Sequence, residues 1–144
     1  MSPDAEPLVA LLAAARTKLD EASALVAASL ADLPPFEIDR AYSPKELEPF
    51  DALCDRFVRA IEVAVRYFRA LELNREAMAS ESFRDLLHRM EKYGVICDAE
   101  LWFRMRNVRN RIVHDYLPEE RVQLFEQLRG EFGAELARLL SRLP

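Results

Sequence analysis

Glycine is scarce in this sequence, with only Gly94, Gly130 and Gly133 among 144 residues. Sheet proteins need many tight turns, and tight turns need glycine. The scarcity therefore favours long helices joined by few loops. Long apolar runs are also missing, because no uninterrupted apolar stretch reaches the roughly 20 residues that a membrane-spanning helix requires. We therefore expect no association with membranes.

Cysteine and histidine are rare as well, with two of each. Cys54 and Cys97 lie far apart in the sequence, which is typical of thiols in a reducing cytosol rather than of a disulfide framework. His88 and His114 have no cysteine or histidine at zinc-ligand spacing, so we expect no metal and no cofactor. The first residues, MSPDAEP, lack the positive charge that begins a secretory signal. These features predict a cytoplasmic protein.

Positive charge is in the minority, with 20 Lys and Arg against 25 Asp and Glu and a net charge of −5. Affinity for nucleic-acid phosphates comes mainly from lysine and arginine, so an RNA substrate must be held by a local patch. One stretch, Leu101–Leu117, contains four arginines and no acidic residue before Asp115. Besides Arg109, the arginines of this patch are the expected RNA-binding residues Arg104, Arg106 and Arg111.

Helical periodicity is what the sequence has in abundance, since apolar residues recur every three or four positions in five segments. Ser43, Pro44 and Glu46 predict a capped helix start, and Gly94 and Pro118 mark helix ends. The expected helices span 4–33, 44–73, 80 or 82 to 93, 98–117 and 118 to the C-terminus. This pattern predicts one domain over residues 1–144. Its expected fold is an all-α, up-and-down antiparallel bundle of four long helices and one short one.

The fourth predicted helix has two faces when its residues are placed about 100° apart around the axis. The buried seam consists of Leu101, Met105, Val108 and Ile112. On the opposite side lie Arg104, Asn107, Arg111 and His114. Arg109 lies at the edge of the seam, about 140° from His114. One helix would align this pair poorly, so two copies facing each other in a symmetric dimer would bring both pairs into one cleft.

Arg109, His114 and Tyr116 are residue types that suit RNA cleavage. An arginine guanidinium binds phosphate through paired hydrogen bonds and stabilises the charge that develops there. A histidine titrates near neutrality, so it can accept a proton from a 2′-hydroxyl or donate one to a leaving 5′-oxygen. An asparagine or tyrosine can position the hydroxyl or the phosphate. This chemistry needs no metal ligand.

The same residues also have structural interpretations. An arginine-rich helix face is most often solvated and paired with acidic residues of neighbouring helices, which are numerous in this chain. A single histidine near a helix C-terminus often caps the helix, and Tyr116 would then pack over the turn before Pro118. We interpret His88 as exposed and structural, and Cys54 and Cys97 as buried.

The run Arg109–Tyr116, RNRIVHDY, resembles the R-x4-6-H signature of HEPN domains. More narrowly, it resembles the R-x4-H-x-Y form found in HepT-like toxins, which are also known as nucleotidyltransferase substrate-binding proteins. A polar residue directly after the arginine, here Asn110, is usual in that family. The resemblance covers most of the chain, because the expected helices and the place of the motif before the last of them also agree.

This resemblance implies a homodimeric, metal-independent endoribonuclease whose motifs meet at the dimer interface. Arg109 and His114 would be catalytic, and Asn110 would assist at the same site. Tyr116 would be the tyrosine to which a cognate MNT-type nucleotidyltransferase antitoxin adds AMP, which silences the toxin. That antitoxin and RNA are therefore the expected partners.

Two other hypotheses remain open. The chain could be a non-catalytic module that presents a substrate or a surface to a nucleotidyltransferase, which the overall acidity favours. It could also be a plain helical interaction protein whose arginines make only surface salt bridges, each worth less than about 1 kcal/mol.

Overall fold

The computed structural model describes residue 3 and residues 5–113 and 118–144, and all regular structure within these ranges is helical. The prediction of an all-helical chain is confirmed for this part. The elements are α1 (Ala5–Asp32), α2 (Pro44–Glu76), α3 (Phe83–Lys92), α4 (Ala99–Arg106), α5 (Val108–Val113), α6 (Pro118–Gln127), the π-helix η1 (Leu128–Phe132) and α7 (Gly133–Arg142).

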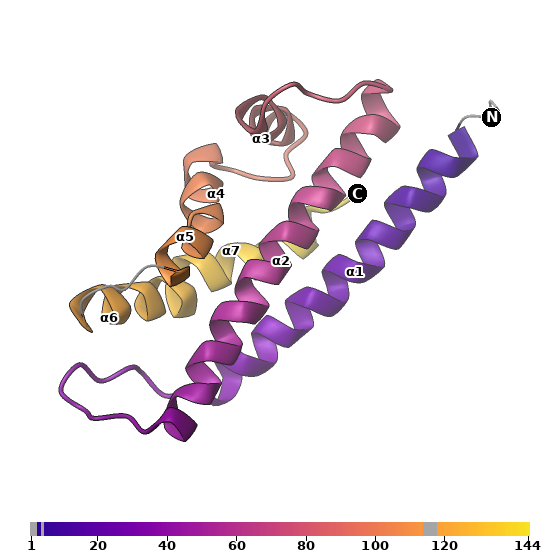
Figure 1. The fold of residues 1–144 in the computed structure, drawn as a ribbon. Helices are drawn as coiled ribbons and strands as arrows, with labels where there is room; N and C mark the ends of the chain where they lie inside the picture. The colour runs from indigo at the N-terminus through magenta and orange to yellow at the C-terminus, as the bar shows by residue number, and fades with distance from the viewer. Residues whose placement is uncertain (1–2, 4, 114–117) are drawn as a thin grey trace.

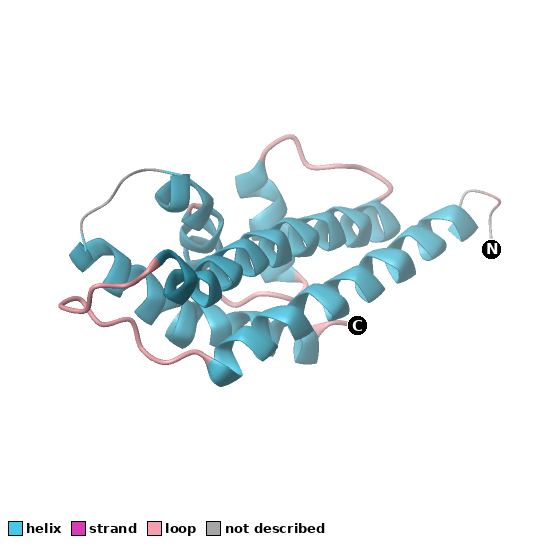
Figure 2. Cartoon of the chain, turned by 60° about the horizontal axis from the view of Figure 1, so that its bottom comes forward, coloured by secondary structure: helices cyan, strands magenta, loops and turns pink. Residues whose placement is uncertain are grey.

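The long helices α1 and α2 run side by side in opposite directions (Figures 1 and 2). Leu19 and Val26 of α1 are buried in the same apolar core as Phe57 and Phe68 of α2. The shorter helices cover this pair, because α3, α4 and α5 pack against α2 while α7 packs against α1. The helix α2 therefore contacts most of the other elements, including those that contain the expected site.

The start of α2 follows the prediction. The Ser43 hydroxyl accepts a hydrogen bond from the Glu46 N–H at 3.2 Å, and the Glu46 carboxylate accepts one from the Ser43 N–H at 3.2 Å. This is the expected capping box, which satisfies two N–H groups that a helix start otherwise leaves without partners.

The end of α2 lies three residues beyond the expected position, at Glu76 rather than Leu73. Near this end, the buried carboxylate of Glu72 accepts hydrogen bonds from the Ser80 N–H at 2.7 Å and from Arg89 at 3.1 Å. These contacts bind the last turns of α2 to the following loop and to α3. Tertiary contacts of this kind leave no periodic signal in the sequence.

The predicted fourth helix is divided into α4 and α5 at Asn107, which contradicts the expectation of one continuous helix. The Asn107 N–H donates to the Phe103 carbonyl at 3.1 Å, and the Asn107 carbonyl accepts from the N–H groups of Asn110 and Arg111 at 3.0 and 3.2 Å. Asparagine is less favourable than most residues inside a helix. The buried seam continues across the break, because Met105 and Val108 are both buried. The apolar periodicity therefore gives no sign of the break.

The last helical run, α6 to α7, contains the wider turn η1 that the sequence did not predict. Gly130 in this turn has φ −95° and ψ −110°, outside the helical region. A Cβ atom on Gly133 would lie 2.6 Å from the Leu128 carbonyl oxygen and 2.9 Å from Cδ1 of Leu30. Glycine at this position therefore allows the turn to pack closely against α1.

A buried polar contact fixes α4 on α7. The Trp102 indole N–H donates to the Glu135 carboxylate at 3.1 Å, and Arg142 donates to the same carboxylate at 2.7 and 3.3 Å. Trp102 is 0% exposed and Glu135 is 3% exposed. A buried carboxylate is tolerated only when charge and hydrogen bonds compensate its lost hydration, and these two partners supply both.

The two cysteines differ in environment. Cys54 is buried as expected, and burial raises the pKa of its thiol to about 12. Cys97 is exposed, so the expectation that it is buried is wrong. It follows two buried residues, Val95 and Ile96, at the point where the segment between α3 and α4 returns to the surface. His88 is exposed, as expected.

We predict that Glu135→Gln lowers the free energy of unfolding by about 1–3 kcal/mol, because an uncharged amide replaces the carboxylate that accepts from Trp102 and Arg142. Urea denaturation of the purified protein measures this loss. Glu131→Gln is the matched control, since Glu131 is a partly exposed carboxylate that accepts from Arg104 at 2.7 Å. Glu131→Gln should lower the free energy of unfolding by less than about 1 kcal/mol. Equal losses in the two variants would show that the buried contact is no stronger than the surface one.

Candidate functional site

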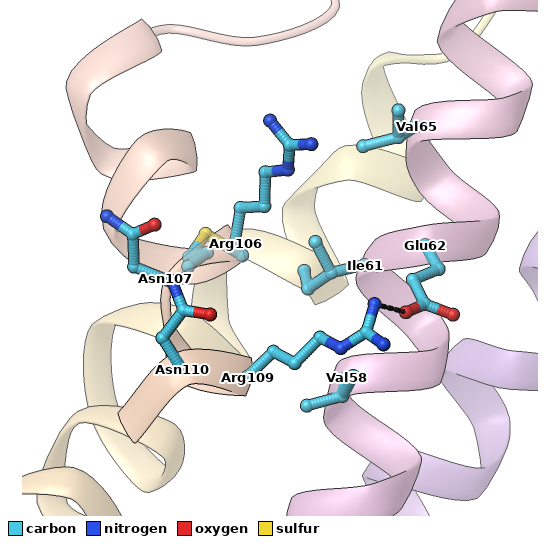
Figure 3. Close-up of a pocket in the computed structure, with 9 residues that line it drawn as sticks. Val58, Ile61, Glu62, Val65, Arg106, Asn107, Arg109 and Asn110 are labelled. Atoms are coloured by element: carbon cyan, nitrogen blue, oxygen red, sulfur yellow. Dashed lines mark hydrogen bonds and ion pairs between the residues drawn. The ribbon is translucent and has the colours of Figure 1, made fainter. Parts of the chain in front are cut away.

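A groove of about 620 Å³ lies between α2 and the α4–α5 segment (Figure 3). We call it the α2–α5 groove. The wall formed by α2 consists of Val58, Ile61, Glu62 and Val65. The opposite wall consists of Met105, Arg106, Asn107, Arg109 and Asn110. The groove therefore has mainly apolar side chains and Glu62 on the α2 side and cations and amides on the other, and its volume is within the range of about 300–1,000 Å³ typical of ligand sites.

The groove brings together three of the residues that the sequence singled out. Arg109 and Asn110, expected at the catalytic centre, lie beside each other on α5, and Arg106, expected to bind RNA, lies at the end of α4. All three are exposed. His114 and Tyr116, the other two expected site residues of the motif, lie outside the described residues.

Arg109 extends across the groove to α2, where its Nη1 lies 3.2 Å from Oε1 of Glu62 (Figure 3). The side chains of this ion pair are 71% and 48% exposed. An exposed pair of this kind contributes less than about 1 kcal/mol. Glu62 therefore orients the guanidinium without holding it strongly, and a phosphate that offers paired acceptors can replace the carboxylate at little cost.

Arg104 and Arg111, the other two arginines of the basic stretch, lie away from the groove. Arg104 pairs with Glu131 of η1 at 2.7 Å, and Arg111 donates to the side-chain carbonyl of Gln127 in α6. The expected patch is thus distributed over several directions rather than gathered on one face. For Arg104 and Arg109, the structural interpretation of paired surface arginines describes the observed contacts.

Arg106 turns toward α3 instead. Its guanidinium carbon lies 4.1 Å from the centre of the Phe83 ring, within the range of a favourable cation–π contact. Figure 3 shows the Arg106 side chain directed away from that of Arg109. The two guanidinium groups therefore leave the same wall of the groove in different directions.

Sequence reasoning missed the α2 wall. Val58, Ile61 and Val65 fit the helical apolar spacing of α2, but no feature of that spacing assigned them to a site. Glu62 was not expected to have any role. Its contact with Arg109 joins residues 47 positions apart, and a single sequence contains no signal for such a pair.

The arrangement can bind an anion and place amide groups beside it. Arg109 offers two or more N–H donors in a planar fork, and the Asn110 side chain can donate or accept next to it. Within residues 3, 5–113 and 118–144 no cluster of three or more His, Cys, Asp or Glu side chains is placed to hold a metal ion. In the same part of the chain, no helix is long and apolar enough to span a membrane.

The sequence matches the family described as nucleotidyltransferase substrate binding protein like over residues 19–144, which includes both walls of the groove. Neither the comparison with curated proteins nor the comparison with solved structures found a match. The family match covers most of the chain, and the HepT-like, HEPN-type proteins that the motif resembles belong to the same family. The chain belongs to the nucleotidyltransferase substrate-binding protein-like family.

Proposed function

We propose that this protein is a metal-independent endoribonuclease that acts as the toxin of a toxin–antitoxin pair in the cytoplasm. The observation that supports it most directly is the placement of Arg109 and Asn110 side by side in an open groove. Among the described residues, the partner of the Arg109 guanidinium there is the exposed carboxylate of Glu62. Family membership supports the same proposal, because the HepT-like proteins share the R-x4-H-x-Y sequence. The up-and-down antiparallel bundle of HEPN domains is part of this proposal.

In the proposed reaction, Arg109 binds the scissile phosphate and stabilises the negative charge that builds up on its oxygens. His114 accepts the proton of the 2′-hydroxyl, whose oxygen then forms a bond to phosphorus. The bond from phosphorus to the 5′-oxygen breaks, and the leaving oxygen takes a proton from a protonated histidine. The products are a 2′,3′-cyclic phosphate and a 5′-hydroxyl. Asn110 positions the reacting groups.

A symmetric dimer would supply the second histidine that this scheme needs. One His114 accepts the first proton, while the copy on the partner protomer donates the second. Spacing along the helix favours such an arrangement, because Arg109 and His114 would lie about 140° apart around one axis. The α2–α5 groove, which is open to solvent, is the surface on which the two motifs would meet.

The partner implied by the family's name is a nucleotidyltransferase. We propose that this enzyme is the cognate MNT-type antitoxin and that it adds AMP to Tyr116. In that step the tyrosine oxygen bonds to the α-phosphorus of ATP and pyrophosphate leaves. The adduct would add negative charge two residues after His114, where an RNA phosphate would have to lie, so repulsion would block the site.

A second candidate function is a non-catalytic module that presents a substrate or a surface to the nucleotidyltransferase. Two observations favour it: the net charge of −5 and the pairing of Arg104 and Arg109 with glutamates of the same chain. Such a module would co-purify with its enzyme and would cleave no RNA at any concentration.

We predict that the purified protein cleaves RNA in the presence of EDTA and that His114→Ala and Arg109→Ala each slow cleavage by at least about 100-fold. Gel analysis of labelled RNA measures the rate, and size-exclusion chromatography shows whether each variant keeps its oligomeric state. Arg138→Ala is the matched control, because Arg138 is an exposed arginine on α7 that does not line the groove. Equal cleavage by His114→Ala and the unchanged protein would overturn the assignment.

We also predict that co-expression with an MNT-type nucleotidyltransferase, the proposed antitoxin, adds one adenylyl group and abolishes RNA cleavage. Intact-mass spectrometry measures the addition, and the cleavage assay measures the activity. Tyr116→Phe should gain no adenylyl group and should stay active, because it lacks the accepting oxygen.

Tyr42→Phe is the control for this prediction, since Tyr42 is a partly exposed tyrosine outside the motif. Its mass should rise like that of the unchanged protein. Modification of Tyr116→Phe to the same extent would place the acceptor elsewhere.

A further inference from the structure

Beside the α2–α5 groove lies a second cluster that the proposed reaction does not use. It joins the start of α3 to the exposed side of α4 and consists of Arg84, Phe103, Phe83 and Arg106. We call it the α3–α4 cation–ring cluster. Cation–π contacts occur about once per 70–80 residues in proteins, and here two of them share one pair of touching rings.

The geometry of this cluster is that of two rings with a cation on each. The Phe83 and Phe103 rings meet edge to face, with centroids 5.3 Å apart and an interplanar angle of 89°. The guanidinium carbon of Arg84 lies 4.6 Å from the Phe103 centroid, and that of Arg106 lies 4.1 Å from the Phe83 centroid. Two planar cations are thus held in position on a surface of the fold.

The rings are supported from below, while the cations remain accessible. Phe83 and Phe103 are partly buried and pack against the apolar core. Trp102, the residue before Phe103 in the sequence, is buried and hydrogen-bonded to Glu135. Arg84 and Arg106 are exposed. Arg84 also has Glu100 at 3.3 Å, whereas Arg106 has a ring and no carboxylate partner among the described residues. The Arg106 guanidinium therefore lies over the Phe83 ring while the residue remains exposed to solvent.

We propose that this cluster is a subsite for an unpaired nucleobase, which stacks on the open face of the Arg106 guanidinium. Unstacked bases bind proteins by stacking on aromatic rings or on guanidinium planes. A guanidinium whose orientation is already set by a ring loses little freedom when a base binds. A base that remains paired and stacked in a duplex has no exposed face to offer.

Continuity with the groove gives the subsite its place on the substrate. Arg106 belongs to both features, since it lines the α2–α5 groove and contacts the Phe83 ring. A phosphate at Arg109 and a neighbouring base on Arg106 can thus be bound by the same strand. In this form the inference rests on the proposed function, because it takes the ligand of the groove to be an RNA phosphate.

The experiment uses Arg106→Lys and Phe83→Leu in the full chain, in a His114→Ala background so that binding is measured without cleavage. Arg106→Lys keeps the charge and removes the planar group, and Phe83→Leu removes the ring beneath it while keeping apolar volume. The probes are a labelled single-stranded oligoribonucleotide and an abasic strand of equal length. Fluorescence anisotropy gives both affinities. Arg138→Lys is the matched control.

Each variant should weaken binding of the complete strand by about tenfold, the order of magnitude of one stacked base, and should leave binding of the abasic strand unchanged. Arg138→Lys should change neither. Equal weakening for both strands would show that the cluster contacts the sugar–phosphate backbone rather than a base, and no weakening would show that Arg106 acts at most as a charge and that the cluster is not a base site. Either result overturns the proposal. If Phe83→Leu lowers the melting temperature, its binding result no longer tests the ring alone. The Arg106→Lys result then decides whether the cluster is a base site.

The two proposals fail in different ways. If the variants weaken binding of the complete strand but not of the abasic strand, and the unsubstituted protein cleaves no RNA, the nuclease proposal is overturned and the base subsite is supported. Cleavage that is insensitive to Arg106→Lys and Phe83→Leu, together with unchanged binding, would overturn the subsite alone. Unchanged RNA binding combined with lost co-purification of the nucleotidyltransferase would assign the cluster to a protein contact and would likewise overturn the base subsite.

Discussion

The position of the candidate site depends on one buried hydrogen bond, from the Trp102 indole to the Glu135 carboxylate. Both side chains are withdrawn from solvent, and a buried carboxylate without partners would be costly, so this contact fixes α4 on α7. The helix α4 ends four residues later, at Arg106. Because the α2–α5 groove and the α3–α4 cation–ring cluster both include Arg106, the placement of each against the core follows from this contact together with the packing of Met105 and Val108 in the core.

Much of the fold was predictable because helix ends are encoded locally. The capping box at Ser43 needs only residues within one turn, and the helix class follows from apolar spacing. The break at Asn107 was not predictable from spacing, since the buried seam continues across it through Met105 and Val108. The extension of α2 to Glu76 was not predictable either, because the added residues contact a later segment: the Tyr93 hydroxyl donates to Glu76, and the Arg75 guanidinium lies over the Tyr93 ring.

The site was predictable only as far as one helix contains it. Arg109 and Asn110 follow from a short motif, and the structure places both in a groove. The other wall comes from α2, and Glu62 reaches Arg109 across 47 positions of the chain. The Arg109–Glu62 pair also explains how a chain of net negative charge can contain a proposed site for anions. An exposed ion pair is weak, so a phosphate can take the place of Glu62 without disturbing the fold.

The division of the helix at Asn107 gives the two arginines different tasks. In one continuous helix, residues three positions apart are neighbours on the same face, so Arg106 and Arg109 would compete for one ligand group. With the break between them, Arg106 reaches Phe83 of α3 while Arg109 reaches Glu62 of α2. In the proposed function, a ligand along this wall would meet a stacking surface at Arg106 and then a phosphate-binding fork at Arg109. A nucleotide has the base and the phosphate to match both.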